Sequence, residues 1–147
     1  MTFDGEYGHS TWEWVADQAE EYESSNGERG NTLRDTGLPV IIMTTIGHRS
    51  GLVRKVPLMK VEHEGQYAIV ASKGGAENHP GWYHNLMAQD EITVQVINDI
   101  FQARTRVAKD EEREAIWTTM VDIYPPYADY QEKTNREIPV VILEKIS

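Results

Sequence analysis

Short apolar runs joined by tight turns are the feature that most constrains the fold of this chain. Between residues 39 and 107, runs rich in Val, Ile and Thr alternate with turns that contain Gly or Asn, a pattern typical of antiparallel strands. The expected strands are residues 39–46, 52–63, 66–72, 92–97 and 101–107, followed by 139–144 near the end of the chain. Tight turns are expected at Glu64-Gly65 and at Asn98-Asp99. Helices and strands do not alternate regularly, which argues against a doubly wound parallel sheet. The sequence predicts about six mainly antiparallel strands in a barrel or sheet of the α+β class.

Helices are expected at both ends of the chain and once between strands. Residues 10–24 carry apolar side chains at helical spacing, Ser10 and Glu13 have the spacing of a capping box, and residues 24–31 read as a flexible linker. The polar face of this first helix is acidic, whereas helices on membrane surfaces favour Lys and Arg, so we expect it to pack on the domain. Asp110 should start another helix that Pro125 and Pro126 interrupt, with a second short helix to Arg136.

Composition excludes several classes of function. A chain of 147 residues predicts one domain, and the absence of cysteine removes disulfides, thiolate nucleophiles and Cys-based metal sites. The net charge of −10 argues against nucleic-acid binding, and the histidines lack the spacing of a ligand pair, so we expect no metal. Residues 38–46 are too short to span a bilayer and no export signal precedes them, which predicts a cytoplasmic protein without membrane insertion.

The first candidate functional segment is TTIGHRSGLVRKVPL, residues 44–58. Gly47 and Gly51 bracket His48, Arg49 and Ser50 between two strands, although a simple hairpin would need one glycine. Residues 47–75 hold five basic residues against two acidic ones, a local charge of +3 in an acidic chain. Such an island suits an anionic small molecule, although lysines and arginines also protect the edges of sheets.

The second candidate is ASKGGAENHPGWYHNL, residues 71–86, where a strand runs through a glycine pair into a helix. Adjacent glycines let a ligand approach the backbone closely, and the N–H groups at a helix start attract anions. The alternative is a plain turn from strand to helix, with Trp82 and Tyr83 as core aromatics. A third and weaker candidate is the set Tyr124, Tyr127 and Tyr130, whose spacing of three places them on one helix face.

The chain resembles the deazaflavin-dependent nitroreductase family. The resemblance is carried by the two segments above, by YPPYADYQ at residues 124–131 and by the terminal IPVVILE. Members of this family are split β-barrel oxidoreductases that use coenzyme F-420, an 8-hydroxy-5-deazaflavin. The resemblance extends from Leu38 to Glu144 and keeps the motifs in order. It implies hydride transfer from C5 of the reduced deazaflavin to an electron-poor conjugated acceptor, such as an enone, unsaturated lactone, quinone or nitroaromatic.

The resemblance also implies roles for individual residues. Residues that would hold the anionic phosphate and glutamate tail of the coenzyme are His48, Arg49, Ser50 and Arg54, with Pro57 lying along it. Residues that would wrap the ring and ribityl chain are Val70, Ala71, Ser72, Lys73, Gly74, Gly75, Gly81, Trp82, Tyr83, His84 and Asn85. Residues that would shape the acceptor site are Met59, Tyr124, Tyr127 and Tyr130. Of these, Tyr127, Tyr130 or water would supply a proton, and Ser72 would hydrogen-bond the ring.

Two departures and two alternatives remain open. His48 and Met59 stand where nitroimidazole-activating relatives often have a basic residue and a tyrosine, which puts tail affinity and acceptor preference in question. The amino-terminal helix is acidic, whereas quinone reductases of the family can have an apolar or basic segment there for membrane contact, so the resemblance favours a soluble acceptor. The same barrel could instead hold FMN, or the protein could bind a deazaflavin or haem without catalysis. Split barrels commonly pair, so a homodimer is also expected.

Overall fold

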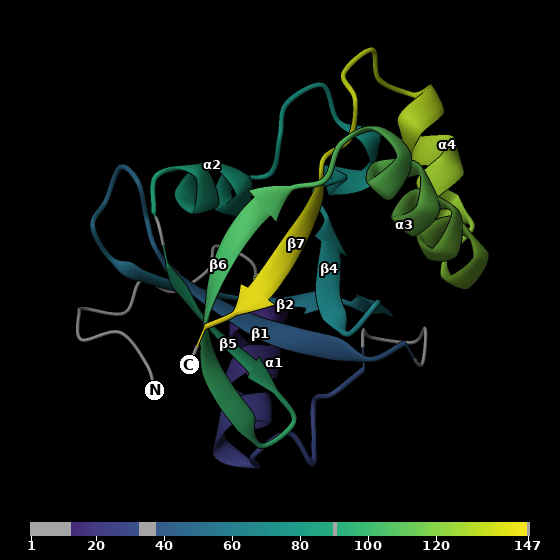
Figure 1. Ribbon diagram of the computed structural model, residues 1–147. Helices are drawn as coiled ribbons and strands as arrows, with labels where there is room; N and C mark the ends of the chain where they lie inside the picture. The colour runs from purple at the N-terminus through teal and green to yellow at the C-terminus, as the bar shows by residue number, and fades with distance from the viewer. Residues whose placement is uncertain (1–12, 33–37, 90, 147) are drawn as a thin grey trace.

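The computed structural model describes residues 13–32, 38–89 and 91–146 (Figure 1). In chain order the elements are α1 (Glu13–Ser24), β1 (Val40–Ile46), β2 (Val53–Met59), β3 (Val61–His63), β4 (Gln66–Val70), the 3₁₀ turn η2 (Lys73–Gly75), α2 (Gly81–Met87), β5 (Ile92–Val96), β6 (Asp99–Val107), α3 (Asp110–Ile123), α4 (Pro126–Glu132) and β7 (Val140–Lys145). The predicted strands and helices are therefore present with ends shifted by a few residues, except that the strand predicted at 52–63 is divided in two.

The strands form one curled antiparallel sheet in the order β2-β1-β5-β6-β7-β4-β3. This confirms the α+β class and the antiparallel arrangement, but the described strands number seven rather than six. The run 52–63, predicted as one strand, divides at Lys60: β2 pairs with β1 at one edge, and β3 pairs with β4 at the other edge. Because a single residue joins the two outermost strands, the sheet has to curl until its edges approach each other.

The tight turns are set by backbone angles that few residues adopt. Glu64 and Gly65 connect β3 and β4 with φ of 51° and 80°, as the type I′ hairpin requires, which confirms the predicted turn. The next hairpin was expected to turn at Asn98 and Asp99. Asp99 instead pairs with Val96, so the turn residues are Ile97 and Asn98, and Ile97 takes the positive φ of 56°.

Strands β1 and β7 are buried on both faces, which explains their continuous apolar runs. In β1, Ile41 and Met43 join the inner core cluster, whereas Val40 and Ile42 pack beneath α1. The same alternation in β7 places Val141 and Leu143 in the inner core, and Val140 and Ile142 against α3 and α4. Figure 1 shows α3 and α4 together beside β4 and β7, with α1 at the opposite end of the sheet. Each face of the sheet is thus covered where its strands are apolar.

The first helix ends at Ser24 as predicted and packs on the sheet through Ala19 and Tyr22, which are 1% and 0% exposed. The predicted capping box at Ser10 lies outside the described residues. Hydrogen bonds hold the segment that follows, because the Gln18 amide nitrogen donates to the carbonyls of Gly30 and Thr32 at 2.9 and 2.7 Å. Within the described part of the chain, no helix is both long and apolar enough to cross a bilayer.

Candidate functional site

The β1–β2 hairpin presents the first predicted group of residues to solvent. The Gly47 N–H donates to the Leu52 carbonyl at 2.8 Å and closes the loop, leaving His48, Arg49 and Ser50 exposed at its tip. A Cβ on Gly47 would lie 2.5 Å from the Ser50 hydroxyl oxygen, so this glycine makes room for the serine. The Ser50 hydroxyl in turn accepts a hydrogen bond from the Leu52 N–H at 3.2 Å.

Asn85 joins this hairpin to α2. Its side-chain oxygen accepts from the His48 backbone N–H at 2.9 Å and lies 2.7 Å from His48 Nδ1. Because an amide oxygen only accepts, His48 carries a proton on Nδ1. The Asn85 amide nitrogen donates to the Thr45 hydroxyl at 3.4 Å, and the Asn85 residue is 7% exposed. A buried amide therefore orients an exposed histidine of the first motif from a helix of the second.

Gln89 fastens the same helix to the end of β1, and the sequence analysis missed it. The Ile46 N–H donates to its side-chain oxygen at 2.9 Å, and its amide nitrogen donates to the carbonyls of Ile46 and Asn85, each at 2.7 Å. Gln89 thus satisfies the backbone groups at the end of β1 much as a neighbouring strand would. The sequence analysis missed it because a single glutamine after a helix forms no distinctive sequence pattern.

The local positive charge predicted for residues 47–75 is partly neutralised in the structure. The Lys55 ammonium lies 2.8 Å from Glu23 of α1, which is outside the segment used for the local charge, and Lys60 lies 3.3 Å from Glu62. Arg49 and Lys73 are exposed, and Arg54 is half-buried. Pro57 is buried opposite Ile42 on edge strand β2, where a missing N–H is tolerated.

The segment after β4 is buried at its start and exposed at its turn. Val70, Ala71 and Ser72 are 6%, 0% and 9% exposed, so their side chains face the interior. Lys73 is exposed and has a φ of 47°, an uncommon conformation for a residue with a Cβ. Glu64 and Ile97 take similar angles in hairpin turns, so the role of Lys73 at the coenzyme stays a prediction.

Gly75 brings the second motif against the third. Its φ is 83°, and a Cβ there would lie 2.5 Å from the Tyr130 carbonyl oxygen and 2.9 Å from the Tyr130 Cα. The missing side chain therefore lets α4 pack directly on η2. The close approach of a coenzyme ring to this glycine pair, which the sequence analysis expected, stays a prediction.

The three tyrosines lie together but differ in exposure. Ring centroids of Tyr124 and Tyr127 are 5.0 Å apart, and the hydroxyl oxygens of Tyr124 and Tyr130 are 3.3 Å apart. The hydrogen bond with Tyr124, together with burial, raises the pKa of Tyr130 to about 12. Tyr127 is 6% exposed within the core cluster beneath α3 and α4, and burial raises its pKa further. Both phenols keep their protons at neutral pH.

The residues of α2 divide between core and surface. Trp82 and Tyr83 are half-buried and pack against the inner core, as the alternative interpretation of this segment expected, whereas Gly81 and His84 are exposed. The His84 ring lies 5.6 Å from the His48 ring between centroids. Met59, on β2, is half-buried between the clusters under α1 and under α3 with α4.

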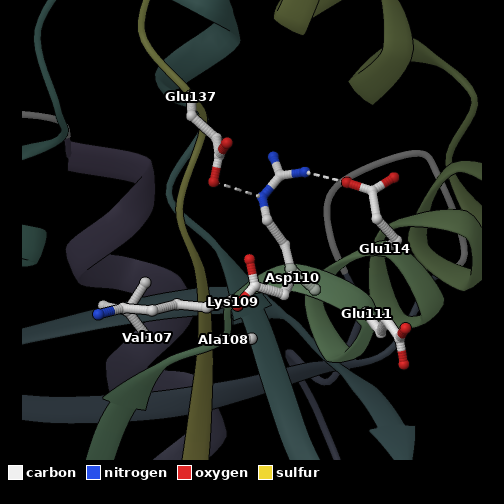
Figure 2. Close-up of a pocket in the computed structure, with 8 residues that line it drawn as sticks. Val107, Ala108, Lys109, Asp110, Glu111, Glu114 and Glu137 are labelled. Atoms are coloured by element: carbon white, nitrogen blue, oxygen red, sulfur yellow. Dashed lines mark hydrogen bonds and ion pairs between the residues drawn. The ribbon is translucent and has the colours of Figure 1, made fainter.

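An open cavity of about 760 Å³ lies elsewhere, where β6 leads into α3 (Figure 2). Its lining contains no residue of the three predicted motifs. The Arg113 guanidinium lies there between two carboxylates, with nitrogen to oxygen distances of 3.2 Å to both Glu114 and Glu137. Four acidic side chains border the cavity, and two of them, Glu114 and Glu137, already pair with Arg113.

Known proteins resemble this chain along most of its length. A sequence model of the family described as "F420H(2)-dependent quinone reductase" matches residues 14–145. An F420H(2)-dependent quinone reductase of Mycobacterium tuberculosis is 31% identical over 127 residues, which cover 84% of this chain and 85% of that protein.

Two solved structures support the same assignment. One, described as an F420-H2 dependent reductase (FDR-A), is 48% identical with a TM-score of 0.66 and covers 72% of this chain and 94% of its own. Another, described as a domain-swapped dimer, is 43% identical with a TM-score of 0.69 and covers 92% of this chain and 100% of its own. The match of sequence and fold over nearly all described elements places this chain in the F420H(2)-dependent quinone reductase family.

Proposed function

We propose that this protein oxidises reduced coenzyme F-420 and transfers the hydride to a quinone-type acceptor. The observation that carries the proposal is the junction of three distant segments in a chain of this family. His48 of the first bonds Asn85 of the second, and Gly75 of the second packs on Tyr130 of the third. We also propose that enones, unsaturated lactones and nitroaromatics, which are electron-poor like quinones, serve as acceptors.

The residues present fit a flat cofactor with an anionic tail. The hairpin offers N–H and O–H donors and positive charge from His48, Arg49, Ser50 and Arg54, the groups that bind phosphate and carboxylate oxygens. Val70 and Ala71 are buried, so this part of the chain would meet a ring through backbone groups rather than side chains. Lys73, Trp82 and Tyr83 are accessible enough to contact the ring or ribityl chain directly.

The deazaflavin supplies the hydride when bound, and the protein supplies orientation and a proton. Tyr130 suits the proton better than Tyr127, because Tyr130 is half-buried whereas Tyr127 is enclosed in the core. The Tyr124 hydroxyl, 3.3 Å away, holds the Tyr130 hydroxyl in place. Ser72 is proposed to hydrogen-bond the ring, and Met59 and Tyr124 to border the acceptor.

The Tyr130→Phe variant is expected to lower kcat on the order of tenfold without abolishing turnover. Water can replace the phenol as proton source, and orientation contributes more than acid–base chemistry to this reaction. Steady-state kinetics with menadione, together with a coenzyme titration, measure the effect. Complete inactivity with unchanged coenzyme affinity would show instead that the phenol is the obligatory proton donor.

The fold and its relatives also bear on the domain organisation, oligomeric state and location of the protein. We propose that the chain forms one split β-barrel domain and that two copies assemble as a homodimer in the cytoplasm. The curled sheet supports the barrel, and the related domain-swapped dimer supports pairing. Light scattering of the purified protein measures the mass of the assembly, and a monomeric mass across the micromolar range would contradict the dimer.

One titration separates this function from its two rivals. Reduced coenzyme F-420, FMN and haem are each added to purified protein, and affinity is measured before oxidation of the reduced coenzyme is followed by absorbance with menadione or an unsaturated lactone. Tight FMN binding without deazaflavin binding would favour an FMN enzyme. Deazaflavin or haem binding without turnover of any acceptor would favour a storage protein.

A further inference from the structure

Arg136 lies outside the three motifs, yet it makes an unusual set of contacts with the second. Its guanidinium donates to three main-chain carbonyls: Ala76 at 2.9 Å, Ala71 at 3.2 Å and Ser72 at 2.8 Å. Its Nη1 also lies 3.0 Å from His79 Nδ1. One side chain therefore ties both ends of residues 71–79, the segment named here the coenzyme loop.

A second layer of hydrogen bonds holds Arg136 itself. The Gln131 amide nitrogen of α4 donates to the Arg136 carbonyl at 2.7 Å, and the Gln131 oxygen accepts from the Ile138 N–H at 2.9 Å. Arg113 of α3 donates to the Ile138 carbonyl at 2.9 Å and is 7% exposed. The backbone around Arg136 is thus fastened to both helices that cover this side of the sheet.

The contact with Arg136 also decides the protonation of His79. A guanidinium can only donate, so His79 Nδ1 has to accept, and the imidazole is neutral with its proton on Nε2. The groups that face His79 are Arg136, Tyr83 and His84, with ring centroids 4.5 Å away for Tyr83 and 6.0 Å away for His84. Burial and the positive charge of Arg136 lower the pKa of His79, in agreement with a neutral ring.

We propose that Arg136 is a positioning residue that fixes the shape of the coenzyme loop and holds His79 as a neutral N–H donor. Four acceptors spread over nine residues converge on one planar fork, a geometry that the point charge of a lysine cannot reproduce. The inference rests on the proposed function in one respect, namely that residues 71–79 contact the coenzyme. The shape of the loop and the state of His79 can be measured without the coenzyme.

The experiment compares the wild type with Arg136→Gln and Arg136→Lys. In coenzyme-free protein, hydrogen exchange of the Gly75 and Ala76 amides should become about tenfold faster in Arg136→Gln, because their hydrogen bonds lie inside the loop that Arg136 closes. The Kd for reduced coenzyme should rise about 10- to 100-fold, since small displacements of binding groups have effects of this size. Arg136→Lys should give intermediate values for both quantities.

The matched control is Arg106→Gln. Arg106 bonds Glu112 at 2.9 Å and lies 3.5 Å from Glu144, on strand β6 and outside the candidate site. Its loss should lower stability while exchange in residues 71–79 and coenzyme affinity stay within about twofold of the wild type. If Arg136→Gln behaves in the same way, its role is structural only and the inference is wrong.

NMR of the His79 ring tests the inference in the wild type, even if the variants fold poorly. Unprotonated Nδ1 and protonated Nε2 near pH 7 are expected, and a proton on Nδ1 would overturn the inference.

In Arg136→Gln the pKa of His79 should rise toward its ordinary value. In the wild type the pKa of His79 is lower in the folded protein than in the unfolded chain, so protonation of His79 favours unfolding of its surroundings. Lowering the pH until His79 becomes protonated should therefore open the coenzyme loop. A wild type that fails to bind reduced coenzyme would contradict the proposed function while leaving the exchange and NMR results decisive for Arg136.

Discussion

Replacing Gly75 with alanine is expected to lower the free energy of unfolding by about 3 kcal/mol and the Tm by about 6–12 °C. The new Cβ would lie 2.5 Å from the Tyr130 carbonyl oxygen, in a backbone conformation with φ of 83° that alanine disfavours. Relief requires α4 to move away from η2, and α4 carries Tyr127 and Tyr130. Quinone reduction should therefore fall at temperatures where the variant is still folded. Urea denaturation and steady-state kinetics measure the two effects.

Gly65→Ala is the matched control, because it introduces alanine at a positive φ without the steric clash that a Cβ at residue 75 makes with Tyr130. Gly65 has a φ of 80°, but a Cβ there would meet nothing within 4 Å. Its loss of stability should be near 1 kcal/mol, the usual cost of alanine at positive φ, with unchanged kcat and coenzyme affinity. Equal losses in the two variants would show that packing of α4 on η2 is not the reason that residue 75 is glycine.

The Asn85→Ala variant is expected to raise the Kd for reduced coenzyme about 10- to 100-fold. Asn85 accepts from both the backbone and the ring of His48, which is proposed to bind the anionic tail. Without the amide, the hairpin tip loses its attachment to α2 and the His48 ring can rotate. Stability should also fall by about 2 kcal/mol, because a buried hydrogen-bonded group is removed. Fluorescence titration and denaturation measure the two quantities.

Gln89→Ala is the matched control for this prediction. Gln89 attaches the same helix to the same strand end through Ile46, but among the described residues it makes no hydrogen bond with His48. It should show a comparable loss of stability with coenzyme affinity within about threefold of the wild type. If both variants lose affinity equally, attachment of α2 rather than orientation of His48 determines binding.

Most elements of the fold could be predicted from local pattern. Alternating and continuous apolar runs located the strands, Glu64 and Gly65 located a turn, and Pro125 and Pro126 separated α3 from α4. The error at 52–63 arose because the residues on either side of Lys60 are both strands and pair with different partners, β1 and β4. A change of partner leaves no mark on a local pattern, since it depends on how the whole sheet curls.

Local pattern also identified the candidate site but not its internal contacts. Glycines and polar donors marked the segments 44–58 and 71–86 because such residues are conspicuous beside apolar strands. Sequence alone did not show that Lys55 pairs with Glu23, that Gly75 packs on Tyr130, or that Arg136 closes the coenzyme loop.

The sequence by itself thus determined the family and the class of fold, and it marked the segments that are proposed to carry the chemistry. The class of fold and the candidate segments follow from residue types and spacings within about 15 positions, where backbone propensity and side-chain periodicity act, whereas the family follows from the order of several motifs along the chain. The tertiary structure alone decided which of those residues are exposed and which groups hold them. Arg136 and Ala76, for example, are 60 positions apart, and only the packing of α4 and β7 beside β4 brings them within hydrogen-bonding distance.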